Sequence, residues 1–202
     1  MLSALYVKAA IVLQKIGACP AWIREMFSCF LTPGPEAPWT FPPALRERLQ
    51  QAHGPYEPDV EDFRTDDLDR VLSDLHRLAD QHFAMALDVL RRDEPDFLMA
   101  VELGPDRLHH AMWQHIDPAH PRYEAGNRYE DAARAYYAAL DAHLGQLARA
   151  AGEDTTVMLV SDHGARAMRG GIRINEWLAE RGWLAIRHRP SAPTRLADAD
   201  VD

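Results

Sequence analysis

The sequence predicts an α/β fold with a mostly parallel sheet sandwiched by helices. Between Asp66 and Arg187, long segments with apolar residues at helical spacing alternate with short apolar runs that are bounded by turn residues. Strands that are separated by long helices pair in parallel and carry those helices on their faces. Ligands of such sheets bind outside the carboxyl ends of the strands, so chemistry is expected there.

The first long helix is expected to begin at Asp66 or the residue before it, either of which can cap it, and to run to about Arg92. One apolar face is traced by Leu68, Val71, Leu72, Leu75, Leu78, Phe83, Leu87 and Leu90. Phe97–Val101 is a short apolar run, which is typical of a strand covered on both faces. A second helix is expected from Pro105, because proline suits the first turn of a helix.

The second half of this region repeats the pattern. A long helix is predicted over Asn127–Ala151, and Gly152 ends it. Thr155–Val160 is the most β-branched run in the chain and predicts a central strand. A short helix over Asn175–Arg181 and a last strand over Trp183–Arg187 complete the predicted elements.

The chain divides into four predicted parts: an atypical N-terminal segment (1–30), a proline-rich connection (31–58), a partial α/β domain (59–189) and a disordered tail (190–202). In the first part, apolar residues recur at roughly helical spacing from Leu2 to Ile16. The proline-rich part is expected to be extended and irregular, with one short helix at Ala44–Gln51, because proline removes amide donors.

Composition limits the classes of function. The formal net charge is -9, which argues against wrapping of nucleic acid and against docking on an anionic membrane. The negative net charge is compatible with a phosphorylated substrate, because bound cations reverse the local electric field of a site. The two cysteines, Cys19 and Cys29, provide no disulfide framework, and no apolar stretch approaches the roughly 20 residues of a membrane span. We therefore expect a cytoplasmic protein.

The sharpest motif is Ser161-Asp162-His163-Gly164, directly after the predicted strand. A carboxylate and an imidazole are suitable ligands for zinc, manganese or iron, and Gly164 lets the backbone turn sharply beside them. An aspartate after a strand often only caps the next turn, so the tetrapeptide alone leaves both interpretations open.

A second motif follows the earlier strand. Asp106 and His110 are four residues apart, which on a helix places both on one face, whereas His109 points away by roughly 100°. Taken alone, such a pair is more often solvated than metal-bound. Taken with Asp162 and His163, it indicates a two-metal site, in which ions about 3.5–4 Å apart clamp the attacking and leaving oxygens of a phosphoryl displacement.

Several stretches resemble the type I phosphodiesterase/nucleotide pyrophosphatase branch of the alkaline phosphatase superfamily, over roughly Cys29 to Arg187. They are Thr155–Gly164 (TTVMLVSDHG), Asn175–Leu184 (NEWLAERGWL), Pro105–Trp113 (PDRLHHAMW), Tyr136-Tyr137, Leu140-Asp141, Phe30–Gly34 (FLTPG) and Phe41–Pro43. The resemblance implies an alkaline phosphatase-like fold and a hydrolase of phosphate esters.

The resemblance also implies roles for particular residues. Asp162 and His163 would bind the metal that activates the nucleophile, and Asp106 and His110 would bind the other metal. The implied cofactors are two divalent ions, zinc or else manganese, and the implied substrate is a small phosphorylated compound, with nucleotides as candidates. The catalytic nucleophile would be a threonine or serine. Arg166 and Arg169 are candidate contacts to a substrate phosphate, against the alternative of a solvated basic loop.

The chain departs from the family pattern near its start. Met1–Ser28 contains no aspartate, and neither Ser3 nor Ser28 has a recognisable nucleophile context. Each metal would keep two protein ligands where catalytic zinc usually has three. We therefore expect an incomplete, truncated or split enzyme with weak or no activity, and a partner chain or second copy covering an exposed sheet edge. The alternatives are a non-catalytic remnant that acts by association, and sulfate-ester or phosphoglycerate chemistry.

Overall fold

The computed structural model describes residues 9–15, 26–27, 39–168, 170–188, 191–192 and 194, with the main chain alone in the first two ranges. The chain splits into two units, Met1–Ala167 and Met168–Asp202, which are described separately.

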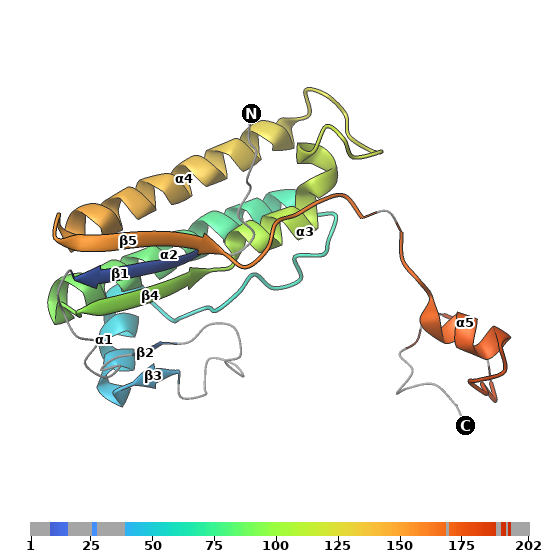
Figure 1. Ribbon diagram of the computed structural model, residues 1–202, viewed down its shortest axis with the longest axis horizontal. Coiled ribbons are helices and arrows are strands. Elements are labelled where there is room, and N and C mark those ends of the chain that lie inside the picture. The colour runs from blue at the N-terminus through green and yellow to red at the C-terminus, as the bar shows by residue number, and fades with distance from the viewer. Residues whose placement is uncertain are drawn as a thin grey trace. The chain divides into compact units, whose positions relative to one another are not determined.

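A three-stranded sheet forms the first layer of the larger unit. Its order is β4 (Phe97–Glu102), β1 (Ala9–Lys15) and β5 (Thr155–Ser161). Strand β1 runs antiparallel to both neighbours, so β4 and β5 point in the same direction on either side of it (Figure 1). The predicted parallel pairing is therefore wrong for the described strands. The helices between β4 and β5 do orient these two strands alike, but β1 lies between them. Strand β1 comes from the N-terminal segment, for which the apolar spacing indicates a helix.

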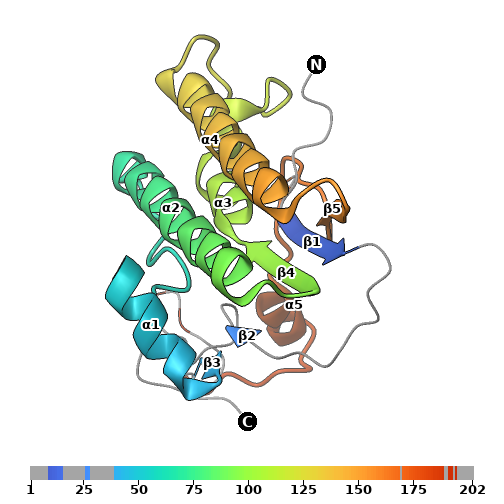
Figure 2. The same ribbon diagram turned by 90° about the vertical axis from the view of Figure 1, so that its left-hand side faces the viewer.

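Helices form the second layer, and their bounds follow the sequence prediction closely. They are α1 (Pro43–His53), α2 (Leu68–Asp93), α3 (Gly104–Ile116) and α4 (Arg128–Ala151). Asp67 caps α2 by accepting a hydrogen bond from the amide of Arg70, one residue beyond the expected cap. Helices α2, α3 and α4 lie on the same side of the sheet (Figures 1 and 2). A short pair, β2 (Met26–Phe27) and β3 (Thr40–Phe41), is antiparallel.

The core lies between the helices and this one face of the sheet. Buried apolar side chains from α2, α3 and α4 form a single cluster that includes Val71, Leu75, Met85, Leu108, Met112, Tyr136 and Leu147. Helix α2 has the longest apolar stripe, as its 3.6-residue spacing predicts. Burial of this cluster supplies most of the driving force that holds α3 against α2 and α4.

The second face of the sheet is not covered by any of the helices that the structure describes within the larger unit. Along β4, Leu98 and Glu102 are buried, whereas Phe97, Met99 and Val101 are 43%, 56% and 36% exposed. Strands β4 and β5 are the two edge strands of this sheet, and β5 carries four consecutive exposed apolar residues. The predictions of a sandwich and of a central β5 are therefore wrong for the described part. The sandwich is absent because all three long helices pack on the same side, and β5 lies at an edge because β1 is its only described partner strand.

In the smaller unit, the described residues form one helix, α5 (Ile174–Glu180). Trp177 and Trp183 pack edge to face with ring centroids 5.6 Å apart, and Gly182 turns the chain between them with a φ of 70°. Residues 183–187, where a last strand was predicted, form bends with a single bridge residue at Ile186. Most of the predicted tail, 190–202, lies outside the described residues. Among the helices that are described, none is long and apolar enough to cross a membrane.

Candidate metal centre

The carboxyl ends of β4 and β5 lie level with each other. Glu102, the last residue of β4, and Ser161, the last residue of β5, both pair with Ala9 of β1. With one strand between them, the two ends are about 10 Å apart, since neighbouring strands are spaced by roughly 4.8 Å. The residues that follow β4 and β5 therefore reach the same edge of the sheet.

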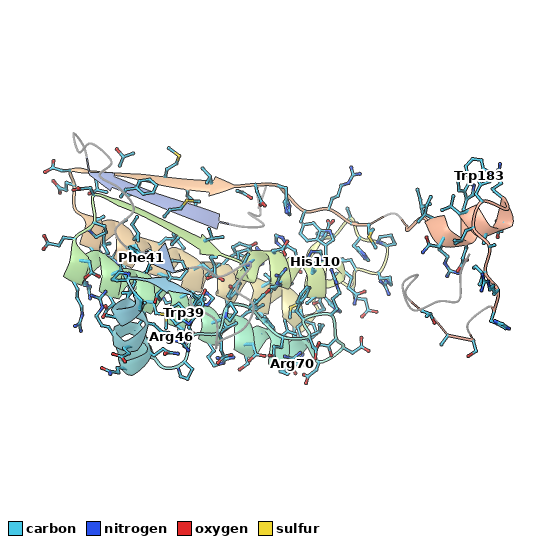
Figure 3. All side chains as sticks on the ribbon, turned by 90° about the horizontal axis from the view of Figure 1, so that it is seen from below. Trp39, Phe41, Arg46, Arg70, His110 and Trp183 are labelled. Carbon is cyan, nitrogen blue, oxygen red and sulfur yellow. The ribbon has the colours of Figure 1, made fainter. Side chains whose placement is uncertain are left out.

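Asp106 and His110 occupy the first two turns of α3. Asp106 is only 4% exposed, while the His110 side chain is half exposed. His110 is labelled on α3 in Figure 3. Asp106 Oδ1 lies 3.7 Å from His110 Nε2. Two ligand atoms bound to zinc at about 2.1 Å with a tetrahedral angle are roughly 3.4 Å apart. The pair is therefore spaced as two ligands of one ion.

Asp162 and His163 form a similar pair in the turn after β5. Asp162 Oδ1 lies 3.7 Å from His163 Nε2, and both side chains are about half exposed. His163 Nδ1 donates to the carbonyl oxygen of Gly164 at 3.0 Å, and Ser161 Oγ donates to the carbonyl of His163 at 2.7 Å. The first hydrogen bond needs a proton on Nδ1, so in the neutral ring Nε2 carries the lone pair, as in a metal-ligating histidine.

The two pairs do not merge into one centre. Within residues 39–168 and 170–188, no group of three or more histidine, cysteine, aspartate or glutamate side chains is placed to hold a metal ion. Burial is the main cause of the lowered pKa of His109, the neighbour of His110, and the positive charges of His110 and His163 add smaller decreases. Two pairs of candidate ligands, here called half-sites, therefore follow the same edge of the sheet. Arg166 is exposed in the following loop, and Arg169 lies outside the described residues.

Three residues that the sequence analysis did not single out surround Asp106. Arg107 Nη1 donates to Asp106 Oδ2 at 2.6 Å. Its Nε donates to both oxygens of Asp59, at 2.7 and 3.0 Å, and its Nη2 also contacts Asp59. The guanidinium lies 4.6 Å from the ring centre of Phe63, which is itself 5.8 Å from the ring of His110. No local pattern predicts this, because Asp59 is 48 residues away from Arg107.

A buried carboxylate sets the junction between β4 and α3. Glu102 Oε1 accepts a hydrogen bond from the amide of Gly104 at 2.7 Å, and Oε2 accepts one from His82 Nδ1 at 3.3 Å. His82 Nε2 donates to the carbonyl of Glu57 at 2.7 Å. Because both partners are acceptors, the ring carries both protons.

Burial opposes this charge and lowers the pKa of His82, but the hydrogen bond and charge of Glu102 outweigh it, so the pKa is raised from 6.5. The carbonyl of Glu57 and the charge of Asp59 add to the increase, and the ring of Tyr56 packs 5.5 Å from the imidazole. A charged histidine and a carboxylate thus hold the start of the helix that carries Asp106.

His109 lies on a different face of α3 from His110, as the spacing predicts. Its Nε2 shares a hydrogen bond of 2.9 Å with the hydroxyl of Tyr137 on α4, and its ring packs edge to face on Trp113. Burial lowers the pKa of His109 to about 4, so the ring is neutral near pH 7. This histidine joins α3 to α4 and is not part of the Asp106–His110 pair.

A family model for type I phosphodiesterase / nucleotide pyrophosphatase matches residues 15–199. The chain belongs to this family. The resemblance inferred from the motifs is thereby confirmed. No curated protein and no solved structure matches the chain.

Membership of this family suggests a phosphoric ester hydrolase of the phosphodiesterase/pyrophosphatase type. It implies phosphorylated or nucleotide substrates and an α/β fold, and the family generally depends on divalent metals. The donor sets on the chain fit this chemistry, because each half-site pairs one carboxylate with one imidazole at ligand spacing.

Proposed function

We propose that this family member is a divalent-metal-dependent hydrolase of phosphate esters. Asp106 and His110 would hold one ion, and Asp162 and His163 a second, with zinc preferred and manganese as the alternative. The observation that supports this is the spacing of 3.7 Å between oxygen and nitrogen in both pairs, which follow two level strand ends.

When bound, such ions supply Lewis-acid polarisation of a phosphoryl group. The chain's own residues bind and orient the substrate. The guanidinium groups of Arg166 and Arg169 would pair with phosphate oxygens through two parallel hydrogen bonds each. The nucleophile is unassigned. Because each ion has two protein ligands where three are usual, we expect weak metal binding and slow turnover.

The test is hydrolysis of bis-p-nitrophenyl phosphate and p-nitrophenyl phosphate with added Zn²⁺ or Mn²⁺. Replacing either member of a ligand pair, as in His110→Ala or His163→Ala, is expected to lower the metal-stimulated rate about tenfold or more. The matched control is His143→Ala, because His143 Nε2 and Asp80 Oδ1 form an imidazole–carboxylate pair at 2.9 Å between α2 and α4, outside the proposed site. Full activity in both ligand variants would remove the proposed site.

A second candidate function is non-catalytic association with a partner chain or a second copy. The exposed apolar side chains of β4 and β5 favour it, and β5 is an edge strand without a charged residue, which readily pairs with another chain. Size-exclusion chromatography with light scattering tests this candidate. A monomer of wild type at micromolar concentration, with a mass unchanged by Met99→Lys, would count against it.

A further inference from the structure

The two oxygens of the Asp106 carboxylate have different neighbours. Oδ2 accepts a hydrogen bond of 2.6 Å from Arg107, whereas Oδ1 is directed at His110 Nε2 at 3.7 Å. A carboxylate that rotates freely offers either oxygen, or both, to an ion. Here one oxygen is already engaged, so the other is presented to the position that an ion shared with His110 would occupy.

Arg107 is itself held from two further directions. Asp59 contacts it through both carboxylate oxygens, and the ring of Phe63 lies under its guanidinium. The Arg107 side chain is 11% exposed and that of Asp106 is 6% exposed, so neither turns into solvent easily. The fork of the guanidinium therefore bridges two carboxylates, only one of which belongs to the candidate metal site.

We propose that Asp59 and Arg107 are positioning residues for the ion at Asp106 and His110, with Asp59 acting through Arg107. This inference rests on the proposed metal site. Arg107 holds Oδ2 of Asp106 so that the carboxylate binds an ion through Oδ1 alone. Asp59 fixes the guanidinium and offsets its positive charge, which would otherwise oppose a divalent cation nearby.

The experiment measures Mn²⁺ affinity of the full chain by electron paramagnetic resonance of free Mn²⁺, which needs no turnover. Asp59→Asn is expected to raise the Kd about tenfold, as is typical when the partner of a metal ligand is removed. In an Arg107→Gln background the same Asp59→Asn change is expected to alter the Kd less than about threefold, because Asp59 no longer has the group through which it acts.

The matched control is Glu57→Gln. Glu57 is two residues from Asp59 and forms its own two-fold hydrogen-bonded pair with Arg77, at 2.7 and 2.8 Å, without contact to Asp106. The Glu57→Gln change removes the same negative charge from the same loop, and the Kd for Mn²⁺ is expected to stay within about twofold of wild type. An equal weakening by Glu57→Gln, or an equal effect of Asp59→Asn in both backgrounds, shows long-range charge alone and overturns the proposal.

Arg107→Lys provides the test if Asp59→Asn fails to fold. Lysine keeps the positive charge but lacks the planar fork that bridges two carboxylates, so the Kd is expected to rise about fivefold or more. An unchanged Kd overturns the positioning role.

His110→Ala separates a failure of the proposed metal site from a failure of the positioning role. If it leaves Mn²⁺ binding unchanged, the metal site itself fails. If the Kd rises in His110→Ala but is unchanged in Asp59→Asn and Arg107→Lys, the metal site stands and only the positioning role is refuted.

Discussion

Gly104, the first residue of α3, has no room for a side chain. A Cβ added there would lie 1.8 Å from Tyr136 Oη and 2.7 Å from Glu102 Oε1, both on buried residues. The φ of Gly104 is not positive, so the cost of Gly104→Ala is steric and not conformational. Overpacking of a core typically costs about 1–3 kcal/mol, and a contact this short places the variant near 3 kcal/mol. For a chain of this length, that lowers the Tm by about 6–12 °C.

Urea unfolding of four proteins tests this reasoning: wild type, Gly104→Ala, Tyr136→Phe and the double variant. Tyr136→Phe removes the hydroxyl, after which the nearest Tyr136 atom to the added Cβ is the ring carbon Cζ, at 3.0 Å. Gly104→Ala should therefore cost at least about 1 kcal/mol less in the phenylalanine background.

Gly145→Ala in α4 is the matched control, because its added Cβ meets only the mobile end of Arg149 at 3.2 Å. It is expected to stabilise the chain by about 0.5–1 kcal/mol. Equal costs of Gly104→Ala in both backgrounds, or a neutral Gly104→Ala, would refute the steric account.

Two further predictions concern the helices that frame the site. The pKa of His82 is raised above its unfolded value of 6.5, so its contribution to stability is complete below pH 6.5 and is lost as the pH rises through the folded pKa. The free energy of unfolding of wild type should therefore fall with rising pH more than that of His82→Gln, and parallel urea midpoints from pH 6 upward would contradict this. Asn127 caps α4 by accepting from the amide of Tyr129 at 3.1 Å, and its amide donates to the carbonyl of His115 at 2.8 Å. Asn127→Ala should cost about 1–2 kcal/mol by urea unfolding, whereas Asn127→Ser should cost less because serine also caps.

Secondary structure was predicted well where its signals are local. Asn127 and Gly152 bound α4, Pro105 starts the first turn of α3, and the alternation of long and short apolar segments locates β4 and β5. These signals act within a few residues, through capping hydrogen bonds, fixed φ and the period of the apolar face. The N-terminal strand was missed because apolar spacing in a short segment does not separate a helix from a strand that gains its partners elsewhere.

Motif spacing and apolar periodicity are local properties, and from them the family, the long helices and the pairing of Asp106 with His110 and of Asp162 with His163 could be predicted. Tertiary packing was needed to show that β1 separates β4 from β5, that the helices described in the larger unit leave one face of the sheet uncovered, and that Asp59 and Glu102 hold the start of α3. These features depend on strand pairing and on buried charges that meet across long stretches of chain. Which carboxylate meets which guanidinium is therefore known only once the core has packed.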